Sequence, residues 1–416
     1  MNATSQPQNP QPTAVVWHEN LLQYRFSDEH PMAPLRLDLT YRLIEAFDLI
    51  SADHVSVIEP PVATDEELAA VHDPAYIAAV QGAGSSLIPD DAHGLGTDDC
   101  PIFTDLHASA ARIAGGSLAA ADAVWSGTVK RAVNFAGGMH HAARAAASGF
   151  CIYNDCALAI QRLLDSGAQR VAYIDVDAHH GDGTQSIFYD DPRVLTISLH
   201  ETGYSLFPGT GFPTESGGPG AEGTSVNVAL PPRTGDAGFL RAVHATVPQL
   251  LRAFNPDVLV TQHGCDSHHA DPLADLRLTV DGQRQLAFDL ADWAEKFAQG
   301  RWIATGGGGY NPLSVVPRSW AHLVAVAANT PIPVRAEIPQ SWIDHATSLG
   351  AEDLTGDMSL EPESGASKVP TTMGEDADVW WRSWEIGYDP SDPVDQAIMA
   401  TRKEIFPNHG LDPWFD

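Results

Sequence analysis

Short segments that are apolar at nearly every position alternate with alanine-rich segments of helical length, and this alternation constrains the fold more than any other feature of the chain. Five segments are predicted strands: residues 129–135, 170–177, 193–200, 257–264 and 301–307. Three segments are predicted helices: residues 117–127, 155–167 and 236–254. Strands that are continuously apolar are typical of parallel sheets buried on both faces. The sequence therefore predicts an α/β fold, a three-layer α/β/α arrangement around a central, mainly parallel sheet.

The two ends of the chain depart from this pattern. Residues 1–12 are polar and rich in Pro and Gln, so we expect a flexible N-terminal tail. An acidic stretch near 351–378 has few large apolar residues and is followed by a tryptophan-rich stretch at 379–388. We therefore expect the main domain to span residues 13–330. Residues 331–416 would form a C-terminal extension packed on it, with an acidic loop near 351–378.

The chain is strongly acidic, with 54 Asp and Glu against 23 Lys and Arg and a formal net charge of −31. Such a charge disfavours nucleic acid and anionic membranes as partners and is compatible with a lysine-rich partner. No apolar run approaches the roughly 20 residues of a membrane span, and we find no signal-peptide pattern. The four cysteines include no CxxC pair, so we expect reduced thiols in a cytoplasmic protein.

Chemically reactive side chains follow several of the predicted strands directly. They are His140 and His141; Asp175, Asp177 and His179; Asp266; and Tyr310. The carboxyl ends of parallel strands lie along one edge of a sheet, which is where ligands usually bind. Each motif alone is weak evidence for an active site, but the convergence of all of them on one edge of the sheet is strong evidence. We therefore expect an active site at the C-terminal ends of the strands.

Asp177 and His179 have the spacing of two ligands for one metal ion, because residues two apart in extended backbone point to the same side. With Asp266 they offer three ligands and leave a coordination position open, as in catalytic metal sites. Mixed nitrogen and oxygen ligands suit Zn²⁺, and Fe²⁺ or Co²⁺ could replace it. The alternative is a set of solvated loop side chains. The apolar strand before Asp177 and the other reactive residues at this edge argue against it.

The paired histidines and the tyrosine both follow glycines. His140 and His141 could be an ordinary buried pair or further metal ligands. Asp175 and Asp182 are the candidate partners that would orient their rings. Tyr310 follows four glycines, and the Asn-Pro after it is a good helix start, so the loop is free to direct the phenol toward the edge. A phosphate-binding loop is a poor match because no Lys follows the glycines.

With these residues in view, the chain resembles the zinc-dependent histone deacetylase superfamily, which has the arginase/deacetylase fold. The motifs that carry the resemblance are HPMAPLR (30–36), TDDCP (97–101), NFAGGMHHA (134–142), SGFCIYND (148–155), IDVDAHHGDGT (174–184), FPGTG (207–211), HGCD (263–266) and GGGGYNP (306–312). They run in order from about residue 15 to about residue 328. The stretches 24–37, 266–279 and 405–413 are most similar to the bacterial acetoin-utilization deacetylases of the AcuC type.

The resemblance implies roles for the matching positions. The zinc ligands would be Asp177, His179 and Asp266. The catalytic residues would be His140, His141, Tyr310, Asp175 and Asp182. Within this set His141 would be the general base and acid, His140 its electrostatic partner, and Tyr310 the hydrogen-bond donor to the substrate carbonyl.

The resemblance also implies a channel for the substrate. Its residues would be Asp99, Gly149, Phe150, Phe207, Met139, Leu273, Gly308 and Arg36. Asp99 would hold the substrate backbone, Phe150 and Phe207 would flank the acetyl-lysine stem, and Arg36 would line an exit for acetate. Met139 stands where eukaryotic class I members usually have Trp, so a softer and differently shaped channel floor is expected, and the sequence does not indicate the acyl-chain preference.

A structural K⁺ is a further implication of the resemblance. The positions that match the family's inner monovalent-cation site are Asp175, Ser198 and Leu199, and part of the outer site matches Phe188, Asp191 and Val194.

The sequence therefore favours a zinc-dependent deacetylase that removes acetyl groups from acetyl-lysine in proteins. The family-implied substrate is a metabolic enzyme such as an acyl-CoA synthetase. Three alternatives stay open: an acetylpolyamine or other small-amide hydrolase, a catalytically silent acetyl-lysine binding module, and a ureohydrolase that uses two manganese ions. The complete set of candidate catalytic residues argues against the silent module, and the further metal-binding carboxylates of a ureohydrolase are not found. The sequence does not indicate the oligomeric state.

Overall fold

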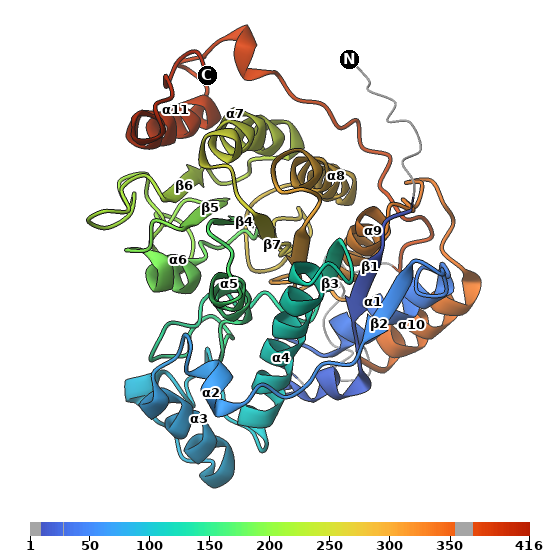
Figure 1. Cartoon of the computed structure of the whole chain (residues 1–416). Coiled ribbons are helices and arrows are strands. Elements are labelled where there is room, and N and C mark those ends of the chain that lie inside the picture. Colours follow the sequence, from blue (N-terminus) through green and yellow to red (C-terminus); the bar gives the residue numbers. More distant parts are fainter. Residues whose placement is uncertain (1–9, 28, 354–368) are drawn as a thin grey trace.

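An eight-stranded, parallel sheet forms the centre of the molecule in the computed structural model, which describes residues 10–27, 29–353 and 369–416 (Figure 1). The strands lie in the order β2 (Val55–Ile58), β1 (Thr13–Val16), β3 (Arg131–Asn134), β8 (Trp302–Thr305), β7 (Val258–Gln262), β4 (Val171–Asp175), β5 (Val194–Glu201) and β6 (Ser225–Leu230). Each neighbouring pair is parallel. The predicted three-layer fold is confirmed.

The continuous apolar strands have the burial that their pattern predicts. Every residue of β3, β4, β5, β7 and β8 is buried, whereas the edge strand β2 is partly exposed. Strands β1, β2 and β6 were not among the predicted ones. Both faces of the sheet are covered, with α7, α8 and α9 on one face and α4 and α5 on the other (Figure 1).

The described part of the chain has these α-helices: α1 (Leu35–Ala46), α2 (Asp65–Leu68), α3 (Pro74–Ser86), α4 (Leu106–Trp125), α5 (Asp155–Asp165), α6 (Asp182–Phe188), α7 (Asp236–Phe254), α8 (Val280–Phe297), α9 (Val316–Ala327), α10 (Gln340–Asp353) and α11 (Pro393–Ile405). Side chains cap several of them: Asn154 accepts the Ala157 N–H at the start of α5, and Thr279 accepts the Gly282 N–H at the start of α8. Helix α4 begins eleven residues before the predicted start at 117 (117 − 106).

The early start of α4 has a packing reason. Gly115 and Gly116 lie inside the helix, and glycines weaken a helix when sequence is judged alone. A Cβ at Gly115 would lie 2.0 Å from the Pro61 carbonyl oxygen, so the glycine permits a close approach of that loop. A tertiary contact therefore explains why two glycines lie inside α4, just before the residue where the helix was predicted to start.

The segment after residue 330 contacts the main domain in several places. In α11, Asp395 accepts a hydrogen bond from Arg241 of α7 at 2.7 Å, and the Thr401 hydroxyl donates to the Asn227 carbonyl of β6 at 2.6 Å. The division at residue 330 stays a prediction. Residues 1–9 of the predicted tail and 354–368 of the predicted acidic loop lie outside the described residues.

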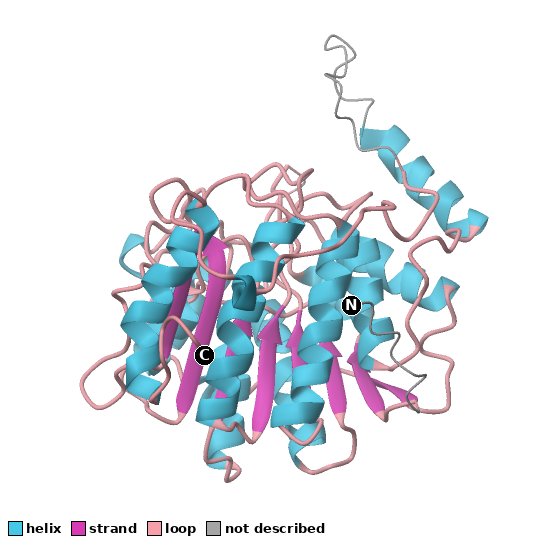
Figure 2. Ribbon diagram, turned by 90° about the horizontal axis from the view of Figure 1, so that it is seen from above, coloured by secondary structure: helices cyan, strands magenta, loops and turns pink. Residues whose placement is uncertain are grey.

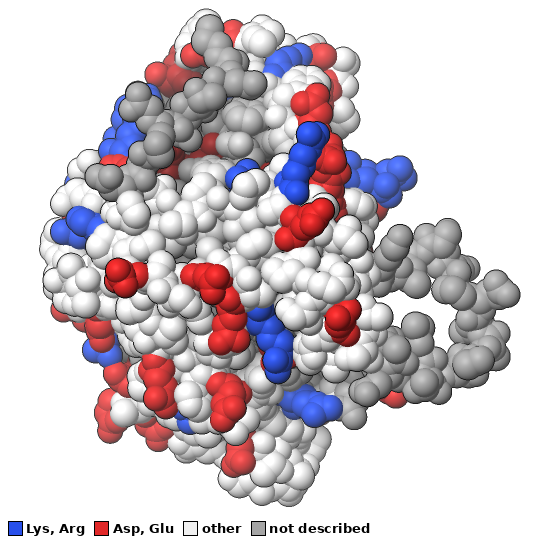
Figure 3. Space-filling view, turned by 90° about the vertical axis from the view of Figure 1, so that its right-hand side faces the viewer, with Lys and Arg blue, Asp and Glu red and all other residues white. Residues whose placement is uncertain are grey.

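No helix in the described ranges has the length and apolar character needed to cross a bilayer. Acidic side chains are spread over the face drawn in Figure 3, with basic side chains among them. This surface agrees with the large negative charge of the sequence.

Candidate active site

The reactive residues predicted from sequence follow strands that are neighbours in the sheet. In the register, Asp175 of β4 lies opposite Ser198 of β5 and Gln262 of β7, and Gln262 lies opposite Thr305 of β8. The ends of these strands are therefore level with one another. The strand arrows point toward a loop-rich edge of the molecule (Figure 2). The loops that carry the candidate site residues leave the sheet along that edge.

Asp177, His179 and Asp266 come together as the sequence predicts. One ligand atom from each lies within 4.8 Å of the others, and all three side chains are buried. The His179 Nδ1 atom is 2.8 Å from Asp266 Oδ2 and 3.2 Å from Asp177 Oδ1. Such proximity is what three ligands of one divalent ion require.

Other groups hold the two carboxylates in place. Asp177 Oδ2 accepts hydrogen bonds from Gln262 Nε2 at 2.7 Å and from the Gly308 N–H at 2.9 Å, and Asp266 Oδ1 accepts one from the Ala178 N–H at 2.8 Å. A Cβ at Gly308 would lie 2.1 Å from Asp266 Oδ2, so only glycine fits beside this cluster. The predicted substrate-binding residue Gly308 thus lies against the candidate metal ligands.

The electrostatics of the cluster favour a cation. Burial raises the pKa of Asp266 to about 6, and the adjacent Asp177 adds to that rise. Burial alone would lower the pKa of His179, but Asp266 and Asp177 outweigh it and hold that pKa well above its usual range. A buried site that stabilises positive charge so strongly, with one nitrogen and two carboxylate ligands, fits Zn²⁺ or Fe²⁺.

The two adjacent histidines have separate carboxylate partners. His140 Nδ1 is 2.7 Å from Asp175 Oδ2, His141 Nδ1 is 2.7 Å from Asp182 Oδ1, and the two Nε2 atoms are 3.1 Å apart. Burial acts to lower the pKa of His140, but Asp175 and Asp177 outweigh it and raise that pKa to about 9. Burial and the neighbouring His140 lower the pKa of His141, although Asp182 opposes the shift. One imidazole is therefore charged and its neighbour neutral near pH 7.

Tyr310 faces the same pocket. Its ring lies edge-on to Phe150 with centroids 5.7 Å apart, and its backbone N–H donates to Asp271 Oδ2 at 2.7 Å. Burial, followed by the charge of Asp266, raises the pKa of the phenol well above its usual value. The phenol therefore keeps its proton and can donate a hydrogen bond.

A cavity of about 290 Å³ leads to these groups. Five predicted substrate-binding residues line it: Asp99, Gly149, Phe150, Phe207 and Leu273. His141, His179 and Tyr310 also line it, so the cavity joins the reactive groups to the surface. Leu206 was not predicted, although its position next to Phe207 was a signal for it. The wall at Gly149 is close to His141, because a Cβ there would lie 2.1 Å from His141 Cδ2.

Arg36 and Met139 do not line this cavity. Both line a separate internal cavity of about 10 Å³. Arg36 Nη1 donates to the carbonyl oxygens of Gly307 and Gly309 at 3.1 and 3.0 Å, and its guanidinium carbon is 5.8 Å from the centre of the Tyr310 ring. An exit for acetate through Arg36 stays a prediction.

The residues predicted to hold K⁺ have other partners in the structure. Asp175 accepts hydrogen bonds from the Tyr173 hydroxyl and the Asp177 N–H, and Ser198 Oγ is 2.8 Å from His200 Nδ1. At the outer position the Phe188 carbonyl accepts the Asp191 N–H at 3.0 Å, and the Asp191 carbonyl accepts the Val194 N–H at 3.1 Å. Leu199 is buried in β5 one position after Ser198. The two cation sites stay predictions.

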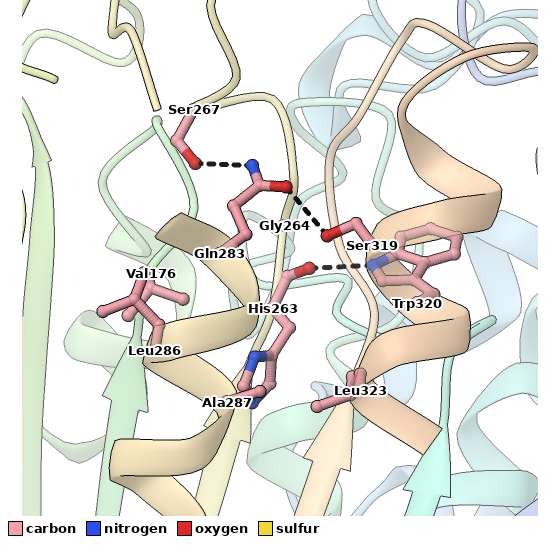
Figure 4. A pocket seen from close by; sticks show the side chains of 10 residues that line it. All are labelled: Val176, His263, Gly264, Ser267, Gln283, Leu286, Ala287, Ser319, Trp320 and Leu323. Carbon is pink, nitrogen blue, oxygen red and sulfur yellow. Dashed lines mark hydrogen bonds between the residues drawn. The ribbon is translucent and has the colours of Figure 1, made fainter. Parts of the chain in front are cut away.

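Gln283, which the sequence did not indicate, supports the loop that carries the candidate metal ligand Asp266 (Figure 4). From α8 its amide nitrogen donates to the Cys265 carbonyl at 3.0 Å and to Ser267 Oγ at 3.2 Å, on both sides of Asp266. Its amide oxygen accepts a hydrogen bond from the Ser319 hydroxyl of α9 at 2.8 Å. These groups line a cavity of about 10 Å³ behind the loop. Two helices thus hold the backbone that presents Asp266.

Comparison with known proteins agrees with this geometry. Residues 30–327 match the family model described as the histone deacetylase domain. The chain is 43% identical over 334 residues to the acetoin utilization protein AcuC of Bacillus subtilis strain 168, covering 80% of this chain and 85% of that protein. It is 41% identical over 350 residues to AcuC of Staphylococcus aureus strain MSSA476, covering 83% and 89%. The crystal structure of an HDAC homologue complexed with SAHA superimposes with a TM-score of 0.79 at 28% identity, covering 94% of this chain and 100% of that one.

The chain belongs to the histone deacetylase family, and it is a deacetylase, a hydrolase of that family. Within the family it is AcuC-like, as the similarity of its opening and closing stretches predicted. The arginase/deacetylase fold is confirmed as well.

Proposed function

We propose that this protein is a zinc-dependent lysine deacetylase that hydrolyses the side-chain amide of acetyl-lysine in proteins and releases acetate. The observation that carries the proposal is that His141, Tyr310 and His179 line one cavity, and that His179 belongs to the buried cluster with Asp177 and Asp266. A general base, a neutral hydrogen-bond donor and a metal ligand set are the parts that amide hydrolysis needs.

A divalent ion held by Asp177, His179 and Asp266 would supply a Lewis acid that polarises the amide carbonyl and acidifies water. His141 has a lowered pKa and so is neutral and able to accept the proton of the attacking water. Its Nδ1–H donates to Asp182, which leaves Nε2 as the base. When the C–N bond breaks, the same nitrogen returns the proton to the leaving lysine amine. General acid–base help of this kind contributes about 10²–10⁴ in rate.

Tyr310 would stabilise the negative charge that develops on the substrate carbonyl, and the positive charge of His140 would act on its neighbour His141. The Tyr310 phenol donates a hydrogen bond to the carbonyl oxygen as negative charge develops there, and its raised pKa keeps the donor protonated. His140 is positively charged at neutral pH because Asp175 and Asp177 raise its pKa to about 9. Its charge lowers the pKa of the neighbouring His141, which therefore stays neutral until it takes the proton of the attacking water.

The walls of the cavity suit an unbranched stem. Phe150 and Phe207 line it together with Leu273, so a methylene chain can bury its surface against apolar side chains. Asp99 uses Oδ2 to accept the Gly149 N–H at 2.6 Å, and its other oxygen is available for an N–H of the substrate backbone. A peptide substrate would thus be held at the mouth while its acetyl group reaches the metal cluster.

The finer parts of the proposal go beyond the family. We assign a metabolic enzyme such as an acyl-CoA synthetase as substrate, since the relatives are named for acetoin utilization. The net charge of −31 favours lysine-rich segments. We also assign Fe²⁺ as a possible substitute for Zn²⁺, K⁺ as a structural ion near Asp175, a cytoplasmic location and a catalytic domain spanning residues 13–330.

The test is hydrolysis by the metal-loaded protein of an acetyl-lysine peptide and of acetylspermidine, with acetate and free amine both measured. The proposal predicts turnover of the peptide with a kcat/KM at least tenfold above that for the polyamine. A preference for acetylspermidine would assign the small-amide alternative. Binding of the peptide without release of acetate would assign the silent binding module.

A further inference from the structure

Two separate loops contribute to the outer wall of the cavity. The chain after β5, residues 202–209, carries Leu206 and Phe207, and the loop at 271–275 carries Leu273. These residues are partly open to solvent, with 45% of Phe207 and 37% of Leu273 exposed. Solvent-facing loops need fixed points if the width of the cavity between them is to be constant.

Glu201, the last residue of β5, links the two loops. Its Oε1 atom accepts a hydrogen bond from the Ser205 hydroxyl at 2.7 Å, and its Oε2 atom accepts one from the Asp275 N–H at 2.9 Å. The two donors belong to the two different loops. The backbone N–H of Glu201 donates to the Ala178 carbonyl at 2.9 Å, between the metal ligands Asp177 and His179.

Burying the charged Glu201 carboxylate is unfavourable, and its two hydrogen bonds offset this cost. Glu201 is only 3% exposed, and burial of a charged group is unfavourable unless it is hydrogen-bonded. Hydrogen bonds to an ionised acceptor are stronger than neutral ones, and both oxygens of a carboxylate can accept. A glutamine of the same shape has no charge and only one accepting oxygen. It can keep both contacts only if its amide nitrogen donates to the Ser205 hydroxyl, and both hydrogen bonds are then weaker neutral ones.

We propose that Glu201 is a positioning residue that sets the width of the outer channel by fixing the Phe207 loop to the Leu273 loop. With both hydrogen bonds in place the walls fit a slender methylene stem. Weakening or loss of either hydrogen bond lets the loops separate, so the stem loses contact and a wider stem becomes acceptable. The choice of a lysine stem rests on the proposed function, whereas the dependence of channel width on Glu201 does not.

The experiment compares Glu201→Gln with the wild type on two peptides that carry the same acetamide. One contains acetyl-lysine, and the other contains 4-(acetamidomethyl)phenylalanine, whose ring replaces part of the methylene chain. We expect KM for acetyl-lysine to rise about five- to tenfold and kcat to stay within about twofold, since two hydrogen bonds to a charged group become weaker neutral ones. The ratio of kcat/KM for the aromatic peptide over acetyl-lysine should rise about tenfold.

Two further variants control the result. Ser205→Ala removes only the hydroxyl that donates to Oε1 and should change the ratio in the same direction, which keeps the test available if Glu201→Gln folds poorly. Glu295→Gln makes the same chemical change at a carboxylate that pairs with Arg131, the first residue of β3, and should leave the ratio unchanged. An unchanged ratio in both Glu201→Gln and Ser205→Ala, or an equal change in Glu295→Gln, would overturn the proposal.

Binding separates this inference from the proposed function. The affinities of a straight-chain hydroxamate and of one with an aromatic linker should show the same change in ratio for Glu201→Gln without any turnover. If the wild type releases no acetate, the proposed function fails while the ratio of hydroxamate affinities still decides the role of Glu201.

Discussion

The Nε2 atoms of His140 and His141 lie 3.1 Å apart, while the Nδ1 atom of each ring is bound to a different carboxylate. The pKa of His140 is raised to about 9, and the pKa of His141 is lowered. Two adjacent imidazoles whose pKa values are shifted in opposite directions can have different roles, with one supplying positive charge and the other accepting a proton.

The pH profile tests this division through Asp182. Asp182 acts to raise the pKa of His141, so Asp182→Asn should lower that pKa further. Because the base works in its neutral form, the acid limb of kcat/KM should move to lower pH in the variant. The plateau rate should fall, since a weaker base accepts the proton less readily. The measurement is kcat/KM between pH 4.5 and 8 at saturating zinc; an acid limb that moves to higher pH contradicts the assignment of His141 as base.

Removal of the Tyr310 hydroxyl tests the hydrogen bond to the substrate carbonyl. Tyr310→Phe should reduce kcat about 10²–10³-fold, the usual loss for one donor to a developing oxyanion. Zinc content and thermal stability should match the wild type, because the phenol is not among the proposed metal ligands. Tyr204→Phe, at a tyrosine that is 88% exposed, is the matched control and should keep full activity. Acetate release by Tyr310→Phe at the wild-type rate would remove Tyr310 from the mechanism.

Substitution of Gln283 tests whether its hydrogen bonds from α8 hold the loop that carries Asp266. Gln283→Leu removes the donors to the Cys265 carbonyl and Ser267 Oγ that flank Asp266. We expect zinc affinity to fall about 10–100-fold, the typical effect of losing a group that orients a metal ligand. Competition with a fluorescent zinc chelator measures this, with Gln285→Leu two residues along α8 as control. Equal zinc affinity in Gln283→Leu and Gln285→Leu would show that the α8 contact does not position the ligand.

Gly308 tests how closely the backbone approaches the metal cluster. In Gly308→Ala the new methyl group would lie 2.1 Å from Asp266 Oδ2 and 3.0 Å from Asp177 Oδ2. We expect the carboxylates to be displaced and zinc binding to weaken at least tenfold. Gly82→Ala in α3, where nothing lies within 4 Å of the added Cβ, should bind zinc normally and be unchanged or slightly more stable. Zinc titration and thermal melting of both variants separate a local effect from a general one.

The sequence predicted the parts of the site that are encoded locally. Asp177 and His179 are two residues apart after a buried strand, and the paired histidines and Tyr310 follow glycines at strand ends, so parallel strand order was enough to bring them together. The supporting residues have no such local signal. Gln283 lies in the first turn of α8, a helix that the sequence did not predict, and Glu201 lies at the end of an apolar strand. Their partners are known only from the packed structure.

The same limit explains the elements that the sequence did not predict. Strand β2 is a partly exposed edge strand, so its four residues lack the continuous apolar pattern of the central strands. The first half of α4 was not predicted because its two glycines have a packing role that appears only when the Pro61 loop is in place.

The account's central claim is that one metal ion at Asp177, His179 and Asp266 supports hydrolysis of acetyl-lysine. The most direct measurement is acetate release from an acetyl-lysine peptide as zinc is added back to metal-stripped protein. We predict no release without metal, a rise that ends at one zinc per chain, and no recovery at any zinc level in Asp266→Ala. Full activity in the stripped protein, or none at any level of Zn²⁺ or Fe²⁺ in the wild type, would contradict the claim.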